Sequence, residues 1–434
     1  MVRVGAPTGV LRERAADAVH ALLGEASPSV RKGFLKEAVW QCAAAGLTCV
    51  QTHEFGEGWS AAEAWNVYAE LQASWSCWSC MTCLHGASSS SLYGPVAPAC
   101  SVHKHALCIG MHSAHTGCHC SHTQAEGELP LRVELTTSSD EEGRPPPGAH
   151  PAASLLRCGR AKIFGDGSLG AETAALRTDY VNELGPTAGA NRGQMIFEPA
   201  ELLRRVRGAA AEGYCLEVHA IGDAAAETVL DAFEAELGPP PPVDAGVAAD
   251  DSGACVGAAA GAAAGAAAGA VVGVAAPLSS RARPVLTHCQ VLGDDIIARM
   301  RALGVVANIQ PSFVATDARF VSQRLAASVH RTSYCWRSLL AAGVWCAGGS
   351  DAPVELPWPL LGMHDAMARA ARPEGGGAAE RATAPAACDV FLPEERLPFA
   401  AALWLYTVGG AYAIGEEATL GQCCNHMHPG CNRS

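Results

Sequence analysis

Short apolar runs alternate along this chain with longer segments in which apolar residues recur every three or four positions. The runs have the length of buried β-strands, and the longer segments have the period of amphipathic helices. Strands that alternate with helices favour an α/β fold with a parallel sheet. Seven runs predict strands, at residues 46–53, 129–137, 158–165, 214–221, 283–290, 304–311 and 343–354.

Two of the helical patterns end in a glycine directly before the next strand. Residues 199–213 and 294–304 close on Gly213 and Gly304, as helix C-termini often do. Seven β/α units are one short of a (β/α)8 barrel. We therefore predict a TIM-like barrel over residues 1–421 with its first strand unaccounted for.

The segment 74–125 follows neither pattern and holds seven cysteines and seven histidines. The spacing Cys77-x-x-Cys80-x-x-Cys83 is typical of zinc ligands, so a zinc-binding insert is one interpretation. The interpretation we favour is a disordered insertion or translated non-coding sequence. Joining residue 73 to residue 126 leaves a helix, a turn and a strand of ordinary length, which supports this choice.

A second segment, 243–280, is dominated by Gly and Ala. Because such small side chains cannot pack a core, we interpret it as a low-complexity surface loop. The tail 422–434 is unrelated in pattern to the barrel.

Composition and charge narrow the classes of partner. Of 434 residues, 49% are hydrophobic, which is enough for a large core. The formal net charge of -13 argues against nucleic acid and anionic membranes as partners. We find no bulky apolar run of membrane-spanning length and no signal-peptide pattern. These features favour a cytoplasmic protein that acts on a small-molecule substrate.

Nineteen cysteines would suggest disulfides in a small secreted protein, but this chain is long. Cys49, Cys215, Cys289 and Cys346 lie inside predicted strands. We therefore expect these four to be buried, reduced residues that behave as small hydrophobes.

Residues of metal-ligand type follow several predicted strands. His219 and His288 close two of them, and Asp351 follows the last one. Lys162 lies within an earlier strand, and Asp166 opens the loop after it. In a β/α barrel the C-terminal strand ends form the active site, so imidazole and carboxylate groups there predict a divalent metal, most simply zinc.

Such a metal would activate water, and Asp351 is the best candidate to accept the proton. Each of these residues could instead have a purely structural role. A single strand-end histidine is often only a hydrogen-bonding residue, and Asp351 before Ala-Pro could cap a turn. Three such residues in order make the metal site the better interpretation.

Several longer motifs resemble the YtcJ-like branch of the amidohydrolase superfamily. With the two inserts left out, the resemblance spans nearly all of residues 5–421. The motifs are KIFGDGSLGAETAAL at 162–176, EVHAIGDAAAETVLDAFE at 217–234, the segments 286–317 and 331–370, and ALWLYTVGGAYAIGEEATLG at 402–421.

The resemblance implies metal ligands at His219, His288 and Asp351, with Asp351 also the proton acceptor. Lys162 matches a strand-four lysine that in many superfamily members bridges two metals as a carbamate, so one or two ions are implied. The same resemblance places three further residues in the substrate pocket: Asp166, Ser168 and Gln310.

The chain departs from the family at both ends. Family members carry a first barrel strand that ends in His-x-His. In this chain the pattern occurs only at His103-Lys-His105 and His426-Met-His428, which lie outside any predicted strand. His53 instead closes the strand at 46–53. We therefore expect the first strand and most of the β-sandwich subdomain to be missing, as in a chain truncated at both ends.

Three functions remain open on these grounds. The first is a metal-dependent hydrolase of a non-peptide carbon–nitrogen bond, in an amide-like or formamide-like substrate. The second is a catalytically inactive barrel that lacks the His-x-His ligands. The third is a zinc-binding protein that acts through the segment 74–125.

Overall fold

The computed structural model describes residues 26–53, 60–73, 106–111, 129–148, 155–181, 190–238, 283–371 and 390–421, together with Val19 and Leu22. The segments 243–280 and 422–434, and both His-x-His patterns, lie outside these residues. Of the segment 74–125 only residues 106–111 are described.

Eight strands form one sheet in the order β2-β1-β3-β4-β5-β6-β7-β8. From β1 and β3 through to β8 the neighbours are parallel, and only β2 pairs antiparallel, with β1. The strands are β1 (Leu47–His53), β2 (Ala106–Met111), β3 (Arg132–Ser138), β4 (Leu156–Phe164), β5 (Cys215–Ala220), β6 (Val285–His288), β7 (Val306–Ile309) and β8 (Cys346–Gly348).

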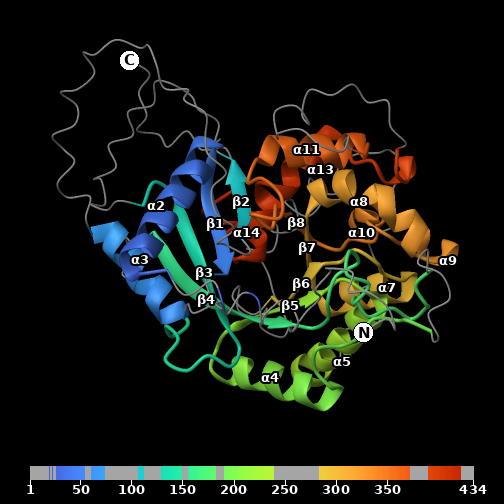
Figure 1. The fold of residues 1–434 in the computed structure, drawn as a ribbon, viewed down its shortest axis with the longest axis horizontal. Helices are drawn as coiled ribbons and strands as arrows, with labels where there is room; N and C mark the ends of the chain where they lie inside the picture. The colour runs from blue at the N-terminus through green and yellow to red at the C-terminus, as the bar shows by residue number, and fades with distance from the viewer. Residues whose placement is uncertain are drawn as a thin grey trace, which may run out of the picture.

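Each of the seven parallel strands overlaps one of the seven runs that the sequence pattern predicts, so the α/β parallel sheet is confirmed. The strand β2 is an element that the pattern does not predict, and it lies inside the segment 74–125. The sheet curls until its two end strands, β2 and β8, approach each other. It is a TIM-like curled sheet, and β2 stands at its edge beside β1 (Figure 1).

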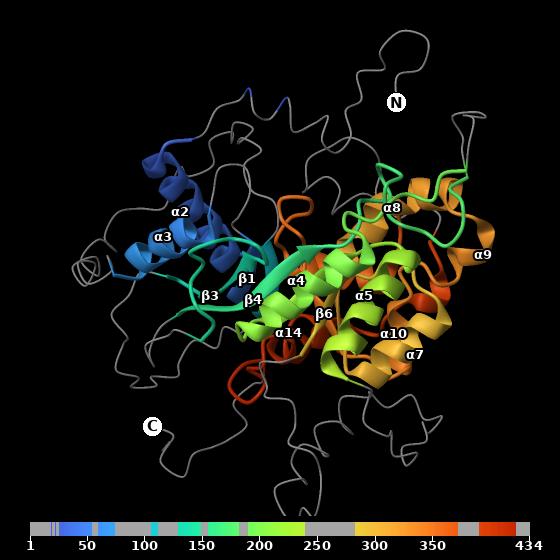
Figure 2. The same ribbon diagram turned by 90° about the horizontal axis from the view of Figure 1, so that it is seen from below.

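Helices surround the sheet on its outer face (Figure 1). Helices α4, α5 and α7 pack side by side against the middle strands (Figure 2). The helices are α2 (Pro28–Ala44), α3 (Ala61–Ala73), α4 (Pro199–Ala211), α5 (Asp223–Leu237), α7 (Asp294–Leu303), α8 (Pro311–Arg324), α9 (Ala327–His330), α10 (Trp336–Ala341), α11 (Pro359–Ala368), α13 (Phe399–Leu405) and α14 (Val408–Ala413), with a 3-10 turn, η2 (Pro393–Glu395).

Local chemistry sets the ends of these helices. Proline occupies the first turn of α2, α4, α8 and α11. A backbone N–H in the first turn has no acceptor within the helix, so proline, which lacks this group, loses no hydrogen bond there. Gly213 after α4 and Gly304 after α7 have φ of 88° and 66°. Glycine adopts this left-handed conformation without steric cost, so the chain can reverse into the next strand. This confirms the two helix ends expected from the sequence.

The core lies between the sheet and the helices. Helix α5 buries Val229, Leu230 and Phe233 completely against neighbouring elements. The cysteines Cys49, Cys215, Cys289 and Cys346 are all buried, as the sequence predicts, and form no disulfide in the described part of the chain. Burial raises the pKa of the Cys49 thiol to about 12, so this thiol stays protonated at neutral pH.

No helix in the described ranges is both long and apolar enough to cross a membrane.

The turn from β5 into α5 allows no side chain at Gly222. A Cβ added there would collide with the backbone of Ala175, which belongs to the loop after β4. Gly208 in α4, by contrast, faces open space. Backbone atoms cannot move aside as a flexible side chain can, so the two glycines differ sharply in what they tolerate.

We expect Gly222→Ala to lower the free energy of unfolding by about 3 kcal/mol or more, because the methyl group overpacks a backbone contact. Gly208→Ala is the matched control, and should raise it by about 0.5–1 kcal/mol through helix propensity. Urea unfolding followed by circular dichroism measures both. Equal effects of the two substitutions would refute the close packing of this turn.

Candidate functional site

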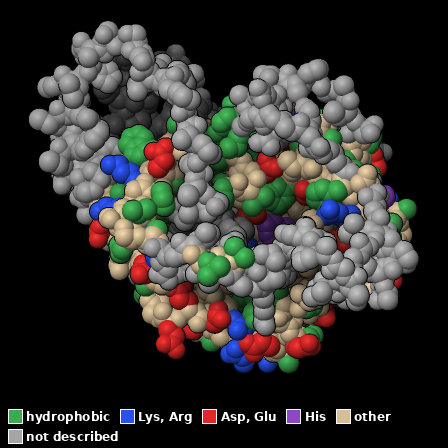
Figure 3. Space-filling view, viewed as in Figure 1, with side chains coloured by type: hydrophobic (Ala, Val, Ile, Leu, Met, Phe, Trp, Pro, Cys, Tyr) green, Lys and Arg blue, Asp and Glu red, His purple; other side chains and the backbone are tan. Residues whose placement is uncertain are grey.

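The predicted ligands lie at the C-terminal ends of parallel strands, on one rim of the curled sheet. His219 is the fifth residue of β5, His288 is the last of β6, and Asp351 follows β8. The two imidazole rings are in edge-to-face contact, with 4.4 Å between their centroids. All three side chains are largely buried. Figure 3 shows histidine surface within a hollow in the middle of this face of the molecule.

His219 is oriented by the loop after β4. Its Nε2 lies 2.9 Å from the carbonyl oxygen of Gly167 and 3.2 Å from Oδ1 of Asp166. A carbonyl oxygen only accepts, so Nε2 carries the proton and donates it. Its Nδ1 is buried and has no hydrogen-bond partner among the described residues. That nitrogen therefore presents a lone pair, as a metal-ligating histidine does.

His288 is oriented in the same way by Gln310, which follows β7. Its Nδ1 lies 2.9 Å from Oε1 of Gln310. The Gln310 amide is itself fixed, because its Nε2 donates to the carbonyl oxygen of Asn308 at 3.3 Å. The Oε1 atom must then accept, which makes Nδ1 of His288 the donor and leaves the Nε2 lone pair for a ligand.

Electrostatics keep His288 neutral. Burial is the largest effect, and with the neighbouring His219 it lowers the pKa of His288 well below its usual range. The charge of Asp351 acts on the same ring in the opposite direction. A neutral imidazole is the form that binds metal, so the environment favours the ligating state at neutral pH.

Asp351 is only partly brought into the site. It has a left-handed backbone, with φ of 56°, and is 5% exposed. Within the described ranges, however, no group of three or more His, Cys, Asp or Glu side chains lies close enough to hold a metal ion. The structure thus joins the two predicted histidines and does not complete a ligand set with Asp351.

Lys162 lies deeper in the barrel and contacts Glu217, a residue for which the sequence predicts no role. Its Nζ is 3.0 Å from Oε1 of Glu217, a carboxylate that is fully buried on β5. Thr287 donates to the same oxygen at 2.7 Å, and Gln51 donates to the other one. His53, at the end of β1, approaches Oε1 at 3.4 Å.

These neighbours hold Glu217 in its charged form. Burial alone would raise the pKa of its carboxyl, but the charges of Lys162, His53 and Arg160 keep the pKa well below its usual range. The position of Glu217 in the sequence indicates that its side chain lies near that of His219. Glu217 is two residues before His219 on one strand, so both side chains face the same side of the sheet.

Asp166 has both carboxylate oxygens committed to the backbone. Oδ1 accepts from the Ile221 amide at 3.0 Å, and Oδ2 accepts from Gly222 and Ala175, each at 2.9 Å. Its side chain thereby ties the loop after β4 to the turn after β5. Because Oδ1 also lies beside His219, this carboxylate helps to place the ring.

Ser168 belongs to the same loop. Its hydroxyl accepts from the Ala171 amide at 3.2 Å, and its own amide donates to Thr173 Oγ1 at 3.0 Å. These contacts shape the tight turn at the start of the GSLG segment. They leave the hydroxyl half-buried at the rim, close in sequence to Gly167, which holds His219.

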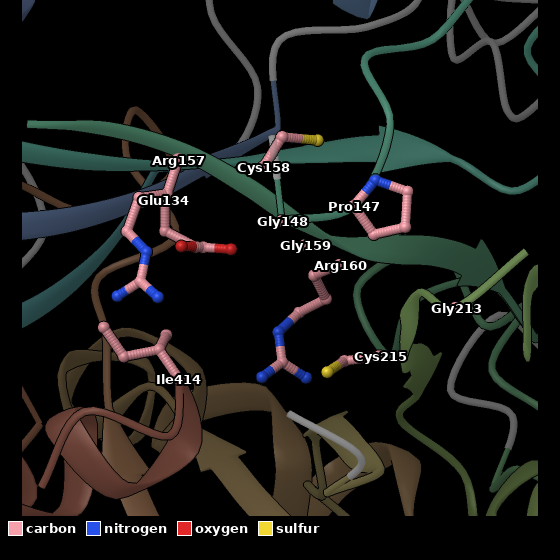
Figure 4. Close-up of a pocket in the computed structure, with 10 residues that line it drawn as sticks. All are labelled: Glu134, Pro147, Gly148, Arg157, Cys158, Gly159, Arg160, Gly213, Cys215 and Ile414. Carbon is pink, nitrogen blue, oxygen red and sulfur yellow. The ribbon is translucent and has the colours of Figure 1, made fainter. Parts of the chain in front are cut away.

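A separate cavity opens at the opposite end of the strands. Glu134, Arg157 and Arg160 point into it from β3 and β4, and Cys215 and Ile414 close it from the other side (Figure 4). Arg160 is fixed by carbonyl oxygens of Leu216 and Ala413. Since residues at the N-terminal face of such a barrel serve stability, we assign this cavity no chemistry.

Asp317 is a half-buried acid in the same region of the fold. It lies on α8 one turn after Phe313, whose ring stacks beside His288 with centroids 6.2 Å apart. Tyr334 donates to its Oδ2 at 2.6 Å. Burial raises the pKa of Asp317 to about 6, with the Tyr334 hydrogen bond opposing this and the charge of Glu355 adding to it.

Comparison with known families gives a match over almost the whole chain. A model of the amidohydrolase family (Amidohydro_3) matches residues 1–279 and 241–423. The chain is 29% identical over 298 residues to YtcJ of Bacillus subtilis (strain 168), an amidohydrolase by name, and covers 46% of that protein. That match takes in 69% of this chain.

A plant protein shows a similar partial match. LONG AFTER FAR-RED 3 of Arabidopsis thaliana is 27% identical over 268 residues, which is 61% of this chain and 36% of that protein. The matched region thus spans less than half the length of either curated relative.

Solved structures give a weaker likeness. A metal-dependent hydrolase from Pyrococcus furiosus is 22% identical with a TM-score of 0.48, over 68% of this chain and 48% of that one. Its counterpart from Pyrococcus horikoshii OT3 is 21% identical with the same TM-score of 0.48 and the same coverage, 68% and 48%.

The contacts of Asp166 predict a large structural cost for Asp166→Asn. The new NH2 group would face backbone amides that need an acceptor, so we expect a loss of about 3 kcal/mol in unfolding free energy. Asp179, which pairs with Arg192 on the surface, is the control. Asp179→Asn should change stability by less than about 0.5 kcal/mol. Similar urea midpoints for the two variants would count against the structural role of Asp166.

The raised pKa of Asp317 predicts a pH-dependent stability. Because the folded pKa of about 6 lies above the ordinary 3.8, the folded state binds this proton more tightly than the unfolded state. The resulting stabilisation is complete below the ordinary value and is lost as the pH rises through about 6.

Asp317→Asn cannot titrate, so its stability relative to wild type should rise by up to about 3 kcal/mol between about pH 4 and about pH 7. Urea unfolding of both proteins at the two pH values gives this difference. Exposed Asp231→Asn serves as the control. A difference that does not vary with pH would show that Asp317 is not perturbed.

Proposed function

We propose that this chain, which belongs to the amidohydrolase family, hydrolyses a carbon–nitrogen bond other than a peptide bond in an amide-like or formamide-like small molecule. The reaction would use a divalent metal, most simply zinc, at the rim where β5 and β6 end. The family supports a hydrolase in general terms. The observation that carries the proposal is the contacting pair His219 and His288, each with one nitrogen donating to the protein and the other available.

The histidine pair suits such a metal in its donor chemistry. Hydrogen bonds to Gly167 and Gln310 fix the two tautomers, as partners of ligating histidines commonly do. The buried Nδ1 of His219 has no partner in the described part of the chain, and a ligand would satisfy it. His219 and His288 would hold the ion, and Asp351 would complete the set.

When bound, the metal would lower the pKa of water and polarise the substrate carbonyl. Asp351 would accept the proton from that water and return it to the leaving nitrogen. Gln310 would keep His288 neutral and correctly turned. Asp166 and Ser168, in the loop that orients His219, would shape the side of the pocket that receives the substrate.

An inactive barrel is the second candidate, and one observation favours it. Asp351 does not join the two histidines in a metal-binding group of three within the described ranges. Two imidazoles alone bind zinc more weakly than the three protein ligands typical of catalytic sites. Zinc content of the purified chain separates the two candidates, since the hydrolase needs a bound ion and the inactive barrel does not.

Loss of either histidine should remove the metal. For His219→Ala and for His288→Ala we expect bound zinc, measured by inductively coupled plasma mass spectrometry after dialysis, to fall to background. His364, which is exposed on α11, provides the control, and His364→Ala should keep its zinc. Zinc retained in both site variants would place the metal elsewhere, for example in the segment 74–125.

Asp351→Asn tests the proton acceptor. A panel of N-formyl and N-acetyl compounds, screened for released amine, identifies a substrate. On it we expect kcat to fall about 10²–10⁴-fold, because the amide cannot accept the proton. The circular dichroism spectrum should not change, and exposed Asp231→Asn should retain full turnover. Full turnover in Asp351→Asn would disprove the assigned role.

A further inference from the structure

We propose that Arg324, the last residue of α8, is a positioning residue for the candidate site. It fastens the loop after β4 (residues 165–181, the strap) along the rim of the sheet. The fastened strap holds His219 in place and limits access to its ring. The inference rests on the proposed function only in taking His219 as part of the working site.

The strap contacts the segments that follow three successive strands. Asp166 accepts hydrogen bonds from the turn after β5. Arg177 pairs with Asp295 in the first turn of α7, which follows β6. Val181 donates its amide to the carbonyl oxygen of Arg324, on the helix after β7, at 2.8 Å. The strap therefore passes the ends of β5 and β6, the strands that carry the two histidines, and lies beside α8 (Figure 2).

The guanidinium group of Arg324 holds the tip of the strap. Its Nη1 donates to the carbonyl oxygen of Leu169 at 3.2 Å and to that of Gly170 at 2.5 Å. Its Nε lies 3.9 Å from Oε1 of Glu172. The group lies over the ring of Phe320, 4.6 Å from its centroid, which fixes the direction of the side chain. Hydrogen bonds from a charged donor are stronger than neutral ones, so this one side chain anchors the tip firmly to α8.

The backbone at the tip of the strap has an unfavourable conformation. Glu172 has φ of 57°, in the left-handed region that residues other than glycine seldom adopt. Its amide donates to the carbonyl oxygen of Leu169 at 3.1 Å, and its own carbonyl oxygen accepts from Nδ2 of Asn191 at 3.2 Å. Surrounding contacts must hold such a residue in place, and Arg324 supplies the contacts from α8.

The base of the strap contacts the candidate site. The carbonyl oxygen of Gly167 lies 2.9 Å from Nε2 of His219, and Oδ1 of Asp166 lies 3.2 Å from the same nitrogen. Only two residues separate this contact from Leu169, which is buried and whose carbonyl oxygen Arg324 binds. A tip released from α8 would therefore loosen the carbonyl group that orients His219 and expose the ring to solvent.

Hydrogen–deuterium exchange of the full chain, measured by mass spectrometry, tests the attachment. Arg324→Met keeps most of the length of the side chain and removes the donors. We expect the amides of residues 168–176 to exchange about tenfold faster, as the loss of one charge-assisted hydrogen bond implies, while the amides of α5 keep their rate. Arg324→Lys, which retains a charged donor, should restore most of the protection. Arg331→Met, at an exposed arginine paired with Asp294, is the matched control and should change neither rate.

Acylation of histidine by diethyl pyrocarbonate tests access to the site. The reaction is run with a chelator, so that bound metal does not affect it, and peptide mass spectrometry measures each ring separately. Relative to exposed His364, we expect His219 to react about tenfold faster in Arg324→Met than in the wild type, and at nearly the wild-type rate in Arg324→Lys. The buried thiol of Cys346 should stay unreactive toward a maleimide in every variant, because the core remains folded.

Three results would overturn the proposal. Equal exchange of the strap in Arg324→Met and the wild type would show that Arg324 does not hold it. Faster exchange without faster acylation of His219 would show that the strap does not control this ring. Reaction of Cys346 in Arg324→Met would assign Arg324 to the stability of the whole fold.

Both measurements are independent of the proposed reaction, because neither uses a substrate or a bound metal ion. A chain that binds no zinc contradicts the hydrolase, while exchange and acylation still decide whether Arg324 holds the strap over His219. A chain that binds zinc but shows equal exchange in Arg324→Met supports the hydrolase and contradicts the role of Arg324.

Discussion

The carboxylate of Glu217 lies fully buried inside this sheet, where polar side chains from neighbouring strands contact it. A carboxylate as deeply buried as that of Glu217 is tolerated only when cations and hydrogen-bond donors surround it. Lys162, Thr287, Gln51 and His53 come from three different strands, β4, β6 and β1, to contact it. The usual filling of such a barrel is branched apolar side chains, so this polar centre ties the strands together by charge as well as by packing.

The candidate metal site lies next to Glu217 along the strands. His219 lies two residues above Glu217 on the same strand, and His288 follows Thr287 on the next one. Each ring is then turned by a different partner, Gly167 for His219 and Gln310 for His288. The charge of Glu217 lies below the two rings, while the hydrogen bonds to Gly167 and Gln310 determine which nitrogen of each ring is available. Together they leave one nitrogen of each ring available to a ligand.

Much of this arrangement follows from sequence, because the signals are local. Apolar runs mark the seven parallel strands, and strand ends place His219 and His288 on one rim. The buried strand cysteines follow from the same pattern. Other features depend on contacts between distant segments. The antiparallel strand β2 has no periodic signal, and the partners of Glu217 are separated from it by up to 166 positions. The distance of Asp351 from the two rings is set by the backbone after β8, which no spacing rule gives.

The proposed function depends on a metal ion held by His219 and His288 at the rim where β5 and β6 end. Crystals of the full chain grown with zinc and measured at the zinc absorption edge test it most directly. We expect an anomalous peak within bonding distance of Nδ1 of His219 and Nε2 of His288. No peak at these two histidines would show that they do not hold the metal.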